Sequence, residues 1–173
     1  SGFLIFFIGR RMFDKKVGLL STTLFFLSDT VWATAISGLP TAMVTSLALL
    51  SFYCAIVCVS NAQADKTFKS IILPLLLCSI CVATAFLTRY AAFAILPGIL
   101  VFLFNGMRRY KLPSILLVSF IFIAMISPWV VRNLEVSGGP FGLTPYLALN
   151  HSIPFPDNTL ERSLVVDIDS ETI

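Results

Sequence analysis

The chain has 173 residues, of which 57% are hydrophobic and 12% are charged, and its mean hydropathy is +0.93. This leaves too little polar surface to cover a soluble globule, so the composition excludes a soluble domain and predicts an integral membrane protein. We assign the net charge of +3 to short basic loops that set membrane orientation, and we expect no nucleic-acid partner.

The first apolar run, residues 1–8, is short, begins without an initiator Met and lacks the basic start of a signal peptide. We therefore expect the remainder of a truncated first helix. The basic loop 9–16 leads into a second run, which begins at Val17 and meets Ser-Asp-Thr at 28–30. Two interpretations are open there: the helix ends at Ser28, or it continues and buries the Asp29 carboxylate.

Four further runs follow, and about 20 apolar residues are needed to span a bilayer. A Ser-Gly-Leu-Pro turn at 37–40 puts a proline near the start of the next helix. Pro-Gly at 97–98 interrupts one run, which we expect to be short, kinked or partly re-entrant. The four runs are 41–59, 70–87, 91–104 and 112–131.

The last run weakens at the Ser-Pro-Trp sequence 127–129, and the chain turns polar from Arg132 onward. Its prolines and glycines favour an irregular segment there. The sequence thus predicts an all-α, polytopic transmembrane helical bundle over residues 1–132, with about six membrane segments, the first truncated. An irregular extracytoplasmic segment is expected over residues 133–173.

The charges test this division, because the runs were drawn from hydropathy alone. If the first basic loop is cytoplasmic and the loops alternate, nine of the twelve cations lie on the cytoplasmic side, as the positive-inside bias requires. The acids from Asp29 onward lie mostly outside. The cations left outside are Arg89, Arg132 and Arg162.

This topology gathers seven side chains with polar groups at the outer face: Asp29, Ser37, Arg89, Tyr90, Trp129, Arg132 and Asn133. Two guanidiniums at the edge of the hydrocarbon region form a clamp for a phosphate, because arginine offers a fixed fork of donors. A lipid-linked ligand would present a phosphate at that depth. In the alternative interpretation, Arg89 pairs with Asp29, and Arg132 anchors a helix end by reaching to the interface.

The other reactive residue types favour structural or solvated roles. We expect the four cysteines, which lie in apolar runs, to be small packing residues. His151 is expected in a solvated loop, where Asn150 also begins a glycosylation sequon. Asp167, Asp169 and Glu171 could bind a divalent cation, but we expect a solvated tail, no metal and no cofactor. The cysteines are Cys54, Cys58, Cys78 and Cys81.

Four stretches together resemble a known family. They are GRRMFDKKVGLL at 9–20, SGLP at 37–40, LTRY at 87–90 with LP at 96–97, and SPWVVRNLEVSGGPF at 127–141. In this order and spacing they look like the middle of a C-type (GT-C) polytopic glycosyltransferase. The similar group comprises dolichyl-phosphate-mannose protein mannosyltransferases and bacterial lipid A aminoarabinose transferases, and the resemblance covers residues 1–141.

The resemblance implies inverting transfer of a sugar from a polyprenyl-phosphate carrier to an acceptor on the outer membrane face, the acceptor being unknown. It implies a catalytic acid in an external loop upstream of Ser1, so the catalytic residue of this chain is unknown. It also maps Arg89 and Arg132 to the level of the carrier phosphate. The membrane would be the plasma membrane in a bacterium and the endoplasmic reticulum in a eukaryote.

The chain departs from the family pattern at two places. It has Ser28-Asp29 where many relatives have Ser-Pro, and Pro40-Thr41 where an acid often follows the turn. An acid-dependent role at that turn is therefore in question. The alternative function is that of a non-catalytic polytopic protein, a transporter or a flippase-like subunit, with Arg89 lining the substrate path.

Overall fold

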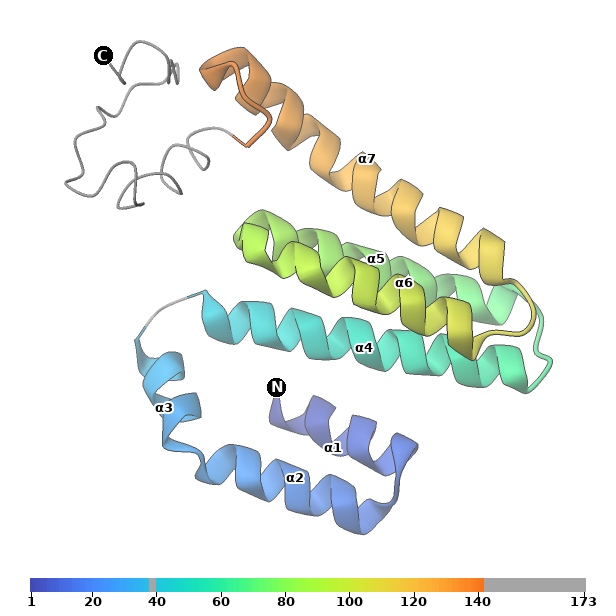
Figure 1. The fold of residues 1–173 in the computed structure, drawn as a ribbon. Coiled ribbons are helices and arrows are strands. Elements are labelled where there is room, and N and C mark those ends of the chain that lie inside the picture. The colour runs from blue at the N-terminus through green and yellow to red at the C-terminus, as the bar shows by residue number, and fades with distance from the viewer. Residues whose placement is uncertain (38–39, 142–173) are drawn as a thin grey trace. The chain divides into compact units, whose positions relative to one another are not determined.

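The computed structural model describes residues 1–37 and 40–141 (Figure 1). Those residues form α-helices and one 3₁₀ helix, with no strand among them, which confirms the all-α class. Helices are expected because a chain in lipid must satisfy its backbone hydrogen bonds within each segment. In chain order they are α1 Gly2–Met12, α2 Lys15–Leu27, α3 Asp29–Ile36, α4 Thr41–Gln63, α5 Lys69–Thr88, η1 Tyr90–Ala94, α6 Ile95–Gly106 and α7 Lys111–Ser137.

The chain divides into two compact units, Ser1–Met125 (unit 1) and Ile126–Ile173 (unit 2). Helix α7 begins in unit 1 and ends in unit 2. The described part of unit 2 is the C-terminal part of α7 and the turn that follows it, to Phe141.

Three described helices, α4, α5 and α7, are long and apolar enough to cross a membrane. Helices α2 and α3 pass the same test only as a pair, and a 58° bend separates them. The segment formed by η1 and α6 is apolar but shorter. The chain is therefore an integral membrane protein with three such helices, or four with the bent pair, and the division into six segments stays a prediction.

Small side chains fill the contact between α4 and α5. Cys54 and Cys58 of α4 and Cys78 and Cys81 of α5 are free and buried, and the hydroxyl of the buried Ser79 donates to the Leu75 carbonyl at 2.8 Å. Membrane helices pack through van der Waals contact, and small residues let their backbones approach closely. The prediction that the cysteines are buried packing residues is confirmed.

Glycines bring α1 and α2 together. A Cβ added at Gly9 would lie 2.8 Å from the Gly18 Cα, and one added at Gly18 would lie 2.8 Å from the Phe6 carbonyl oxygen. Both positions therefore exclude any larger residue unless the helices separate. The Thr22 hydroxyl of α2 donates to the Gly18 carbonyl at 2.9 Å, along its own helix.

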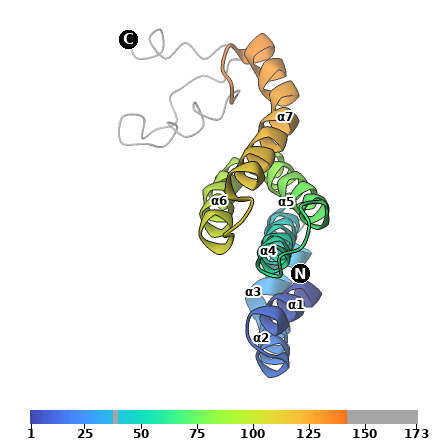
Figure 2. The same ribbon diagram turned by 90° about the vertical axis from the view of Figure 1, so that its right-hand side faces the viewer.

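Consecutive long helices of unit 1 run in opposite directions (Figure 1, Figure 2). The α4–α5 and α6–α7 connections therefore lie together at one end, which we call the basic end. There the Gln63 side chain donates to the Gly106 carbonyl at 3.1 Å. The α5–η1 turn lies at the opposite end, which we call the Arg89 end. The cations of the basic end are Lys66, Lys69, Arg108, Arg109 and Lys111.

The α1–α2 turn lies at the end of these two helices that points toward the basic end. It does not reach that end, because it lies beside the middle of α4 (Figure 1). Arg10 and Arg11 precede this turn and share a pocket with Tyr53 of α4. These cations therefore lie away from the Arg89 end but not level with the basic end, and the predicted alternation of loops stays a prediction. Which end faces the cytoplasm stays a prediction.

The run that Pro97-Gly98 interrupts is short, as one of the predicted alternatives had it, and two prolines lie within helices. Pro97 lies in the first turn of α6, where its missing N–H is tolerated. Pro128 lies inside α7, which continues to Ser137. The expectation of an irregular chain from Arg132 onward is therefore wrong for residues 132–137. Stopping the helix would free more backbone groups than the one amide that proline removes.

Candidate functional site

Arg89 stands at the break between α5 and η1. Its backbone is extended (φ −152°, ψ 118°), which ends α5 at Thr88. Its N–H donates to the Ala85 carbonyl and its own carbonyl accepts from the Ala92 N–H, both at 2.9 Å. The side chain is exposed. The backbone is thus fixed from both sides, while the guanidinium remains available to an anion at the end of two apolar helices.

An aromatic cluster holds this turn. Phe86, only 4% exposed, lies one helical turn before Arg89. Its ring centroid lies 5.6 Å from that of Tyr90, 6.1 Å from that of Phe93 and 5.6 Å from that of Phe122 on α7. Tyr90, predicted as a ligand-binding residue, is half-buried and also contributes its ring to this packing. The cluster therefore fixes the direction in which the chain leaves α5.

Asp29 lies at the break between α2 and α3. Ser28 is extended (φ −74°, ψ 117°), α2 ends at Leu27, and Asp29 begins α3 with an exposed side chain. The predicted helix end is confirmed, and no described part of the protein covers the Asp29 carboxylate, whose depth in the membrane stays a prediction. A carboxylate in the first turn is favoured by the positive end of the helix dipole. Among the described residues no ion pair joins Asp29 to Arg89, so that pairing stays a prediction.

Arg132 and Asn133 lie in unit 2, near the end of α7. Arg132 is exposed, whereas Asn133 is 7% exposed and its amide donates to the Pro140 carbonyl at 3.5 Å. Gly138 adopts a left-handed conformation (φ +69°) that turns the chain back after Ser137. The structure thus gives Asn133 a part in closing this turn, and its predicted contact with a lipid phosphate stays a prediction.

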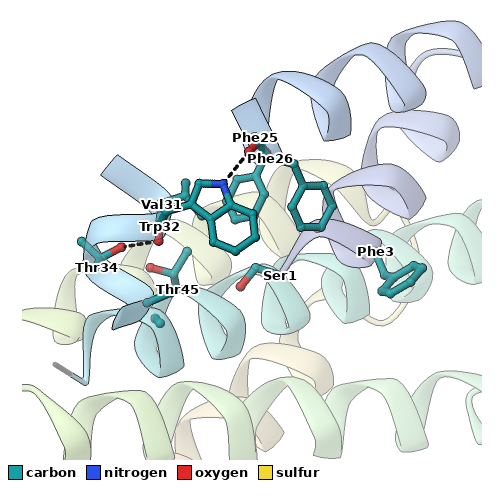
Figure 3. A pocket seen from close by; sticks show the side chains of 11 residues that line it. Ser1, Phe3, Phe25, Phe26, Val31, Trp32, Thr34 and Thr45 are labelled. Carbon is teal, nitrogen blue, oxygen red and sulfur yellow. Dashed lines mark hydrogen bonds between the residues drawn. The ribbon is translucent and has the colours of Figure 1, made fainter. Parts of the chain in front are cut away.

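An apolar pocket of about 400 Å³ opens among α1, α2, α3 and α4 (Figure 3). Trp32 lies across it and donates its indole N–H to the Phe26 carbonyl at 2.7 Å. In an unbroken helix that carbonyl would accept from the Thr30 amide. The lining residues are Ser1, Gly2, Phe3, Phe25, Phe26, Val31, Trp32, Thr34, Ala35, Ala42 and Thr45.

Sequence reasoning missed this pocket. Its lining includes Ala42 and Thr45 from the start of α4, so it belongs to the Arg89 end of unit 1. The available signal was the polar interruption at 28–30 with a tryptophan shortly after it, which marks a bend with an amphipathic ring beside it. The residues that α1 contributes lie far away in sequence and carried no such signal.

Several predicted residues lie outside the described part of the chain. They are His151 and its sequon Asn150, the acidic residues Asp167, Asp169 and Glu171, and Gly38 and Leu39 of the Ser-Gly-Leu-Pro turn. Within the described ranges, no group of three His, Cys, Asp or Glu side chains is arranged to hold a metal ion.

The long apolar helices, with the exposed Arg89 between α5 and the shorter segment of η1 and α6, define a polytopic helical membrane protein. Comparison with protein families narrows this class. The sequence model of the dolichyl-phosphate-mannose-protein mannosyltransferase family matches residues 1–131, about three quarters of the chain. The chain belongs to this family. No curated protein and no solved structure matches it.

Proposed function

We propose that the protein is a glycosyltransferase that moves a sugar from a polyprenyl-phosphate carrier to an acceptor on the outer face of the membrane. The observation that carries this proposal is the family match over residues 1–131, which includes the Arg89 turn. In this proposal, residues 1–132 form the transmembrane domain and residues 133–173 an extracytoplasmic segment. The host membrane would be the bacterial plasma membrane or the endoplasmic reticulum.

Arg89 is the residue to which we assign the carrier phosphate. In an inverting transfer an acceptor oxygen attacks the anomeric carbon, the bond from that carbon to the phosphate oxygen breaks, and the acceptor proton passes to a carboxylate base. The leaving phosphate then gains negative charge. A guanidinium placed where that charge develops lowers the barrier, since its N–H groups hydrogen-bond more strongly to the product oxygen than to the ester.

Support for this role comes from the position of Arg89. The residue is exposed at the end of two apolar helices, so it meets the headgroup level while a carrier chain stays in lipid. We assign Tyr90, Arg132 and Asn133 as further contacts of the phosphate or sugar. The apolar pocket among α1, α2, α3 and α4 lies at the same end of unit 1. Its mostly apolar lining suits the hydrocarbon chain of a polyprenyl carrier.

The test is sugar transfer by the full-length protein carrying Arg89→Ala. We expect kcat/KM to fall about 10- to 100-fold, because a hydrogen-bonded charge contributes about 1.5–3 kcal/mol. The matched control is Arg108→Ala, which removes an exposed arginine from the basic end and should leave transfer within about twofold of wild type. Both variants should insert normally. Undiminished transfer by Arg89→Ala would remove Arg89 from the phosphate site.

A further inference from the structure

We propose that unit 1 holds a second phosphate site, in which Arg10, Arg11 and Tyr53 bind the headgroup phosphate of an anionic membrane lipid. The site lies between α1 and α4, on the side of the α1–α2 turn, away from the Arg89 end. It is independent of the proposed sugar transfer. Its basis is a pocket of about 260 Å³ lined by these three residues and Phe7.

Both arginines come from the last turn of α1. A cation at a helix C-terminus is favoured by the helix dipole, and this alone would account for their presence on α1. It does not account for the pocket that they share with Tyr53 of α4, which lies more than 40 positions along the chain. The ring of Phe7 on α1 lies 6.3 Å from that of Tyr53, so packing holds the two helices together at this level.

Tyr53 brings a polar group to the middle of an apolar helix, α4. Among the described residues, its hydroxyl has no hydrogen-bond partner. Tyr53 is half-buried, and it lines the same pocket as Arg10 and Arg11, so its hydroxyl can donate to a ligand held there. The pocket is lined by this residue, so a ligand oxygen bound between Arg10 and Arg11 is the partner that the geometry supplies.

The charge of the pocket is unbalanced. Among residues 1–37 and 40–141 no acidic side chain lines it, and the nearest carboxylate in the sequence, that of Asp14, accepts from the Val17 N–H at 2.7 Å and caps α2. Two guanidiniums with a neutral hydroxyl donor match the oxygens of a phosphate. A bound phosphate would therefore balance the charge of the pocket.

The surroundings favour a lipid as the source of that phosphate. Phe7 is 45% exposed, and Met12 and Phe13, which follow Arg11, are 52% and 72% exposed. Large apolar side chains next to paired cations suit a ligand with an anionic head and acyl chains. Basic pockets between membrane helices recognise lipid headgroups in this way.

The experiment measures binding of short-chain phosphatidylglycerol to the delipidated full-length protein by native mass spectrometry. We expect Arg10→Ala/Arg11→Ala to weaken binding at least about 10-fold and Tyr53→Phe to weaken it about 3- to 10-fold. The matched control, Lys15→Ala/Lys16→Ala, removes the same charge from the same turn but not from the pocket. It should change binding less than about twofold, and phosphatidylcholine should bind wild type at least about 10-fold more weakly.

Retained binding in the arginine variant, or an equal loss in the lysine control, overturns the site. Inorganic phosphate that displaces the lipid at equal concentration overturns the lipid as its source. If the arginine variant fails to fold, Tyr53→Phe carries the test, since it removes one hydroxyl and keeps the ring contact with Phe7. Sugar transfer is not a readout here, so failure of this proposal is distinct from failure of the proposed function.

Discussion

At the scale of single residues, the position of Arg89 depends on its neighbours more than on its own side chain. Extended backbone at this residue ends α5, and two backbone hydrogen bonds hold it in place. Phe86, one turn earlier, contacts two rings of η1 beyond the break, those of Tyr90 and Phe93, and the ring of Phe122 on α7. The guanidinium is therefore presented by a packed turn and not by a loose loop.

Phe86→Ala tests this support. Removing the ring ends three aromatic contacts, each of which contributes about 0.5–1.5 kcal/mol. We expect a lower thermal unfolding midpoint in detergent and a reduced rate of sugar transfer, although Arg89 itself is intact. Phe120→Ala is the control, because Phe120 is 71% exposed and its loss should leave both quantities unchanged. A Phe86→Ala protein with wild-type stability would contradict the supporting role of the cluster.

At the scale of elements, the close packing of α1 against α2 depends on glycines, which have no side chain, at the positions where the two helices meet. A Cβ at Gly18 would meet the backbone of α1 at two atoms, the Phe6 oxygen at 2.8 Å and the Arg10 nitrogen at 2.9 Å. Backbone atoms cannot move aside as a flexible side chain can. Close approach of this kind is how membrane helices gain van der Waals contact.

Gly18→Leu should therefore separate α1 from α2 and lower stability by about 1–3 kcal/mol, the usual cost of overpacking. Thermal unfolding in detergent measures the change. Gly98→Ala serves as the control, since no atom lies within 4 Å of a Cβ added there and alanine favours a helix. Equal stability of Gly18→Leu and wild type would show that the two helices do not pack through their glycines.

The elements also show what the sequence could predict. The hydropathy pattern predicted where the long helices lie along the chain, because an apolar segment in lipid must form its backbone hydrogen bonds within itself. A lone charge between two apolar runs located the Arg89 break. The aromatic cluster, the glycine contacts and the apolar pocket could not be predicted, because each depends on how separate helices pack against one another. The end of α7 was misplaced because Pro128 was given more weight than the surrounding helix.

At the scale of the whole molecule, the alternation of helix directions accounts for the placement of charge. The α4–α5 and α6–α7 connections carry five cations at the basic end, whereas Arg89 lies at the opposite end of unit 1. Basic loops are retained on the cytoplasmic side. We therefore expect the Arg89 end to face outward, where the proposed transfer takes place.

Cysteine labelling of the full-length protein tests that orientation. Asn105→Cys near the basic end and Asp29→Cys at the α2–α3 break are both at exposed positions, whereas the native cysteines are buried. An impermeant maleimide added from outside should label Asp29→Cys alone. Labelling of Asn105→Cys from outside would reverse the topology and move Arg89 to the cytoplasmic face.

The central claim is that the protein cleaves a polyprenyl-phosphate sugar instead of only moving it across the membrane. The most direct measurement reconstitutes the full-length protein in vesicles with a radiolabelled polyprenyl-phosphate sugar and a membrane extract as the source of acceptor. We predict that free polyprenyl phosphate appears in step with sugar on the acceptor, and that Arg89→Ala slows both. A donor that changes leaflet but stays intact would contradict the account and establish the transporter alternative.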